Sequence, residues 1–156
     1  MLVEDRHYVA GLVPVADCFA GTKATDVVSM AEWGHAEFLI LKGAETTGTT
    51  VITVEACDDF TPSTQVAIPF KYRTCSSGDT WSAVTDAEAT GFTTAAAANV
   101  MYRVEVDSDA IAKAAPTYPN LRLKAVESAN DPVTAAVLIV LSQPRYGNAV
   151  NATAIA

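Results

Sequence analysis

Short segments that alternate apolar and polar residues with a period of two constrain this chain more than any other feature. Residues 51–57 place Ile52 and Val54 on one face, and residues 100–107 repeat the pattern. Because successive side chains of a strand point to opposite sides of a sheet, this period predicts strands with one buried face. Further strands are predicted at 26–30, 35–42, 66–73, 121–125 and 133–141, the last covered on both sides.

The segment 66–73 alternates most clearly and also contains a proline. Its pattern predicts that Val66, Ile68, Phe70 and Tyr72 point inward. Pro69 has no backbone N–H to donate to a neighbouring strand, so this strand should lie at a sheet edge or contain a bulge. Two Ala-rich pieces, 94–98 and 110–115, are long enough for single helical turns only.

Seven or more short strands separated by turn-rich sequences are typical of a sandwich or a jelly roll. We therefore expect an all-β fold, an antiparallel β-sandwich of jelly-roll-like form, over residues 25–142. Residues 1–24 are predicted to be an extended N-terminal arm, because Gly11 and Pro14 break any helix. This arm should lie on a surface of its own chain or of a neighbour. Residues 143–156 are predicted to be a C-terminal tail, either frayed or ordered against a partner.

Composition and charge exclude several partners. The chain has 156 residues and a formal net charge of −8, with ten basic residues scattered among eighteen acidic ones. Binding of nucleic acids draws on clustered Lys and Arg, so we expect no nucleic-acid partner. The acidic N-terminus has no apolar segment typical of a signal peptide, and the apolar run 133–141 is too short to cross a bilayer as a helix. We therefore expect no membrane partner.

The three cysteines form no CxxC motif and leave an odd thiol under any pairing. A disulfide between Cys57 and Cys75 on neighbouring strands is one alternative. Buried free thiols, with Cys18 the third, are favoured for a protein made in a reducing cytosol.

The sequence predicts no enzyme. Its histidines are His7, in the arm, and His35, at the start of a strand, and neither stands in a nucleophile motif. A hydrolase with two carboxylates stays open as an alternative. The loop carboxylates that could serve it are Asp58, Asp59, Asp86 and Glu88.

No metal or other cofactor is predicted. The pairs Asp58–Asp59 and Asp107–Asp109 offer oxygen atoms for calcium, but the glycine and the closing glutamate of a calcium loop are missing. Asp107 and Asp109 are better interpreted as the end of a strand and the cap of the short turn after it.

Several aromatic residues lie in or near predicted loops. They could form the exposed platform of a sugar-binding module, or they could close the ends of the sandwich with their large apolar area. These residues are Trp33, Trp81, Tyr118 and Tyr146. The residues that we select as candidate partner contacts are Tyr8, Leu12, Val13, Trp81 and Tyr146.

Several runs of the sequence carry a resemblance. They include Val54-Glu-Ala-Cys-Asp-Asp, Ile68-Pro-Phe-Lys-Tyr-Arg, Tyr102-Arg-Val-Glu-Val-Asp and Ser142-Gln-Pro-Arg-Tyr. This pattern of strands and turns resembles small virion proteins of tailed bacteriophages and prophages over roughly residues 24–147. The resemblance implies a β-sandwich head decoration (cement) protein, without catalytic residues to carry over.

The resemblance also implies partners and a location. The expected partner is the major capsid protein of the shell, together with self-association that we expect to be trimeric, through Ala95–Ala98 or the tail. The expected location is the exterior of the capsid in the virion, after synthesis in the cytoplasm of a bacterial host. The alternative function is a carbohydrate- or receptor-binding appendage of the head, neck or tail.

Overall fold

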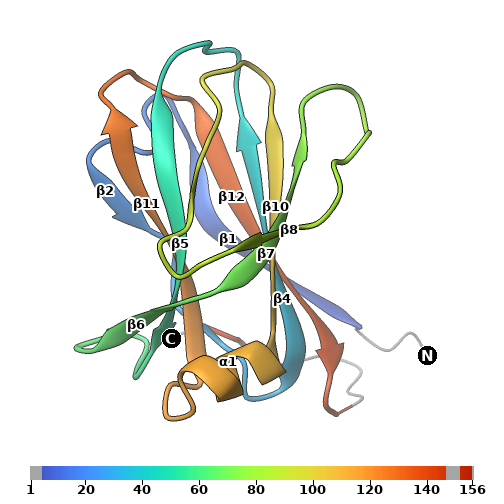
Figure 1. Cartoon of the computed structure of the whole chain (residues 1–156). Coiled ribbons are helices and arrows are strands. Elements are labelled where there is room, and N and C mark those ends of the chain that lie inside the picture. Colours follow the sequence, from blue (N-terminus) through green and yellow to red (C-terminus); the bar gives the residue numbers. More distant parts are fainter. Residues whose placement is uncertain (1–4, 147–151, 156) are drawn as a thin grey trace.

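The protein is a sandwich of two antiparallel sheets, as a computed structural model describes it for residues 5–146 and 152–155 (Figure 1). Every strand pairing in both sheets is antiparallel. The prediction of an all-β sandwich is confirmed. Its jelly-roll form stays a prediction.

We call the two layers sheet A and sheet B. Sheet A has the order β1 (Arg6–Val15), β12 (Ala135–Pro144), β4 (Trp33–Lys42), β10 (Met101–Asp107), β7 (Phe70–Cys75) and β8 (Thr85–Ala87). Sheet B has the order β2 (Thr22–Ala24), β11 (Asn120–Ala129), β5 (Thr49–Cys57) and β6 (Gln65–Ile68). Two short strands, β3 (Val28–Ser29) and β9 (Phe92–Thr93), pair with β11 and β5. The described part of the chain has one helix, α1 (Ser108–Ala114), which lies at one end of the sandwich (Figure 1).

The core lies between the two sheets and follows the predicted alternation. Ile52 and Val54 of β5 are fully buried, as are Phe38 and Ile40 of β4. Val104 of β10 is fully buried as well. Because their neighbours along each strand point outward, the sequence pattern alone separates the inner face from the outer face of these strands.

Pro69 divides the segment that was predicted as one strand. The chain before it forms β6 at the edge of sheet B, and the chain after it forms β7 in sheet A. A residue without an N–H suits this crossing, because the ladder of hydrogen bonds is interrupted there. Ile68 and Phe70 are buried as predicted, but the prediction for Val66 is wrong: it is 37% exposed, because among the described residues β6 is the edge strand of sheet B.

Both ends of the described chain pack on the sandwich. The predicted arm contains β1, which pairs with β12, and β2, which joins sheet B. In the predicted tail, Ala154 is buried and its carbonyl accepts a hydrogen bond of 2.8 Å from the N–H of Ser29. Residues 1–4 of the arm and 147–151 and 156 of the tail lie outside the described residues.

The Ala-rich piece 110–115 largely coincides with α1, which has seven residues. Asp107 occupies the N-cap position, but its side chain makes no capping hydrogen bond. Asp107 thus ends β10 and occupies the cap position as predicted, but its carboxylate contacts His35 instead of making the capping hydrogen bond. The other Ala-rich piece, 94–98, forms no helix.

Candidate functional site

Apolar side chains cover part of the outer face of sheet A. Leu39 and Leu41 alternate with the buried residues of β4, so they point away from the core. In the neighbouring strands, Leu138 lies opposite Leu39, and Met101 lies opposite Leu41. We define the outer apolar strip as Tyr8, Ala10, Leu39, Leu41, Met101, Ala136 and Leu138. Leu41 is 40% exposed and Tyr8 is 60% exposed, so the strip is accessible.

The strip ends at the free edge of β1. This strand pairs with β12 on one side and has no neighbour on the other side among the described residues. Tyr8 and Val13 of β1 are strongly exposed, whereas Leu12 packs partly against the core. An unpaired strand edge offers backbone N–H and C=O groups to a further strand. The edge and the strip together form a surface suited to a protein partner.

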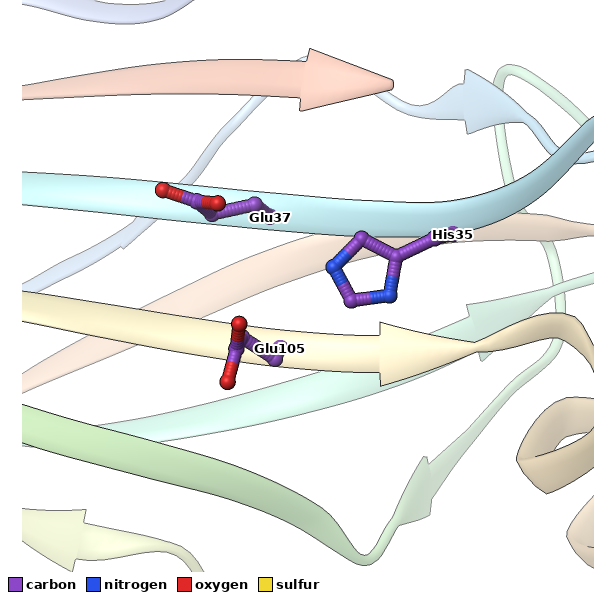
Figure 2. Close-up of side chains that lie close together, drawn as sticks. All are labelled: His35, Glu37 and Glu105. Carbon is purple, nitrogen blue, oxygen red and sulfur yellow. The ribbon is translucent and has the colours of Figure 1, made fainter. Parts of the chain in front are cut away.

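A charged cluster adjoins the strip on the same face of sheet A. His35 and Glu37 lie two residues apart on β4 and therefore point to the same face. Glu105 lies directly opposite Glu37 on β10. One ligand atom from each of these three residues lies within 4.8 Å of the other two. Figure 2 shows one ring nitrogen of His35 pointing toward the space between the two glutamate carboxyl groups. This trio has the residue types that bind a divalent metal ion.

Two charged neighbours contact the trio. Asp107 Oδ1 lies 2.7 Å from His35 Nδ1, which orients the imidazole ring. The guanidinium group of Arg103 forms ion pairs with both glutamates, at 3.0 Å to Glu37 Oε2 and 2.8 Å to Glu105 Oε1. Its Nε is not aligned for a hydrogen bond, so the contact with Glu37 is an ion pair without directed bonding. The three trio side chains are each no more than 20% exposed.

A groove of about 620 Å³ lies between α1 and strands β7, β8 and β10. Its lining mixes apolar residues with acids and lysines, and Glu105 and Asp107 belong to it. The charged cluster therefore borders a hollow that is wide enough for a small ligand or a partner side chain.

Asp58 and Asp59, two of the loop carboxylates considered for hydrolysis or calcium, accept hydrogen bonds from residues of their own loop. Asp58 accepts hydrogen bonds from the hydroxyl of Ser63 and the N–H of Thr64, which lower its pKa. Asp59 accepts a hydrogen bond of 2.7 Å from the N–H of Phe60. Both lie after β5 in sheet B, whereas Asp86 belongs to β8 in sheet A. The structure thus separates Asp58 and Asp59 from Asp86, which lines the groove beside α1 together with Glu88.

The predicted aromatic residues differ in their exposure. Trp33 is buried and stacks on His7 with ring centroids 5.9 Å apart. Trp81 and Tyr118 are half-buried, and Tyr146 is 66% exposed. Trp33 therefore fills the sandwich and offers no platform to a ligand, while Tyr146 stays accessible.

Burial sets the chemistry of the thiols. All three cysteines are free and buried. Cys57 lies in sheet B and Cys75 lies in sheet A, so they are not on neighbouring strands. Burial raises the pKa of the Cys57 thiol to about 11, which disfavours the reactive thiolate.

No family model matches this chain, and no curated protein or solved structure matches it either. Among the described residues, no helix is long and apolar enough to cross a membrane.

Sequence reasoning missed the charged cluster. The alternation of β4 places His35 and Glu37 on one outer face, and that of β10 places Glu105 on an outer face. What the pattern lacks is the register between β4 and β10, which sets Glu105 opposite Glu37. The outer apolar strip was missed for the same reason.

Proposed function

We propose that this chain is a structural virion protein that decorates and stabilises the capsid of a tailed phage by binding the outside of the shell lattice. The single observation that carries the proposal is the outer apolar strip beside the free edge of β1. A surface of this kind is suited to binding another protein through apolar contacts and strand addition. The resemblance of the sequence to small virion proteins supplies the choice of partner.

The physical properties of the chain support this role. A shell offers many identical positions, and contacts with several neighbouring subunits convert modest affinities into strong retention. The net charge of −8 favours a position outside the shell, where the packaged nucleic acid does not repel it. We further propose that the major capsid protein is the partner and that the chain associates as a trimer. Ala95 and Ala96 are exposed and accessible to such a contact.

The carbohydrate- or receptor-binding alternative has weaker support. Such a site would use Trp81, which follows β7 in an exposed loop. The side chain of Trp81 is itself half-buried, so less of its ring is available to a ligand. With Trp33 inside the core, these two tryptophans do not form one exposed platform.

The first experiment counts copies of this chain against the main shell protein by mass spectrometry of density-purified particles. A ratio near one per shell subunit supports the lattice-covering role. A few copies per hundred would move the protein to the neck, a vertex or the tail, and would favour the receptor-binding alternative. Complete absence from particles would refute the virion proposal.

The second experiment tests the surface. Leu41→Ser on the strip and Val66→Ser on β6 change aliphatic residues of similar exposure, 40% and 37%, on different sheets. Binding to particles that lack this chain is measured by cosedimentation. We expect Leu41→Ser to weaken binding about tenfold or more, as for a residue central to an interface, and Val66→Ser to leave it unchanged. Equal effects of the two variants would show that another surface makes the contact.

A further inference from the structure

We propose that His35, Glu37 and Glu105 bind a divalent transition-metal ion, of which Zn²⁺ is the best match, on the outer face of sheet A. One imidazole and two carboxylates supply three protein ligands of the types found in zinc sites. A fourth position stays open for water or for a side chain of a partner. This inference is independent of the proposed attachment to a shell.

The pairing of Glu37 with Glu105 is the first reason. The two residues are directly opposite each other across β4 and β10, and like charges in that arrangement destabilise a sheet. Their side chains are only 20% and 18% exposed, so water screens the repulsion poorly. Arg103 supplies one positive charge between the two negative ones. A divalent cation would neutralise both carboxylates.

The orientation of His35 is the second reason. Its Nδ1 faces Asp107 at 2.7 Å; because a carboxylate only accepts, Nδ1 donates, and in the neutral imidazole Nε2 then carries the lone pair. Metal-binding histidines commonly have such a carboxylate behind them, which fixes the tautomer and strengthens the ligand. Figure 2 shows that the ring nitrogen on the opposite side points between the glutamates. The free nitrogen therefore faces the place where the carboxylates converge.

The distances permit a tetrahedral site after a small adjustment. Ligand atoms around Zn²⁺ at 2.0–2.2 Å lie about 3.4 Å apart. The trio is already within 4.8 Å, so the ligand atoms have to approach one another by at most about 1.4 Å. Arg103 contacts Oε2 of Glu37 and Oε1 of Glu105, which leaves the second oxygen of each carboxylate to the metal.

The test is isothermal titration of the metal-free chain with Zn²⁺, with Co²⁺ absorption as a second readout of coordination. We expect one equivalent to bind to the wild type, and His35→Ala or Glu105→Gln to abolish that binding. Asp107→Asn should weaken it about 10- to 100-fold through loss of the orienting carboxylate. Asp109→Asn is the matched control, an exposed aspartate two residues away that should leave binding unchanged.

Two further readouts separate loss of the site from loss of the fold. Circular dichroism and thermal unfolding of each metal-free variant should resemble those of the wild type. Saturating Zn²⁺ should raise Tm of the wild type by about 5 °C or more and leave Tm of Glu105→Gln unchanged. Absence of Zn²⁺ binding to the wild type, or undiminished binding to folded Glu105→Gln, would overturn the proposal.

Discussion

Gly91→Ala should destabilise the protein much more than Gly78→Ala, although both glycines have a left-handed backbone. Their φ angles are +78° and +61°, so alanine at either position costs about 1–2 kcal/mol in conformational energy. A Cβ at Gly78 meets nothing within 4 Å. A Cβ at Gly91 would lie 1.9 Å from the carbonyl oxygen of Ile52, which is backbone of the central strand β5 and cannot rotate away.

The additional cost at Gly91 follows from the strand that it precedes. The Cβ contact must lengthen by at least 1.1 Å to reach 3.0 Å, and the backbone before β9 has to supply that movement. β9 pairs Phe92 with Ile52, and the ring of Phe92 stacks on Tyr72 with centroids 4.0 Å apart. Weakened backbone hydrogen bonds cost about 1 kcal/mol each, and a disturbed aromatic pair costs a similar amount. We therefore expect Gly91→Ala to cost about 3–5 kcal/mol in total.

The free energy of unfolding of both variants is measured by urea denaturation with a common m-value. For a chain of this size, about 1 kcal/mol corresponds to 2–4 °C in Tm, so Gly91→Ala should melt at least 6 °C lower than the wild type. Gly78→Ala should melt only a few degrees lower. Similar losses at the two positions would refute the argument that close approach to Ile52, rather than the backbone conformation, dominates the cost.

Four further predictions test burial and charge. No thiol of the native chain should react rapidly with Ellman's reagent, whereas all three should react in guanidinium, because the cysteines are free and buried; two reactive thiols after unfolding would indicate a disulfide. Because burial raises the pKa of Cys57 from 9.0 to about 11, its contribution to stability is complete below pH 9 and is lost as the pH rises through 11. The free energy of unfolding, measured by urea denaturation, should therefore fall less between pH 9 and pH 11 in Cys57→Ala than in the wild type. An equal fall in the two proteins would show that ionisation of Cys57 does not cause it. Lys42→Met should lower the free energy of unfolding by about 1–3 kcal/mol in urea denaturation, because the buried ammonium group donates to the carbonyls of Gly48 and Ala95 at 3.2 and 2.7 Å. An unchanged free energy of unfolding would show that these carbonyls find other donors. Arg103→Met should raise the affinity for Zn²⁺ in calorimetric titration, because it removes the cation that competes for the two glutamates, and a lower affinity would show that Arg103 assembles the site.

Local sequence was sufficient to predict which residues of the strands face the core. The alternation around Val54 and Val104 correctly predicted which residues are buried, because the direction of a side chain in a strand depends on its position alone. Pro69 was expected to place a single strand at an edge or in a bulge, whereas its missing N–H lies where the chain passes from sheet B to sheet A. The alternation failed at Val66, since burial there depends on whether a second layer covers the edge of the sheet.

The sequence by itself determined the class of the fold and the two faces of most strands, because both follow from a period of two that each strand carries within itself. Only the tertiary structure decided which strands are neighbours and in what register. That choice turned β1 into a sheet edge, divided the chain between the sheets at Pro69, and set Glu105 opposite Glu37 beside His35. Register between strands that lie far apart in sequence depends on the packing of the whole core, which no short segment contains.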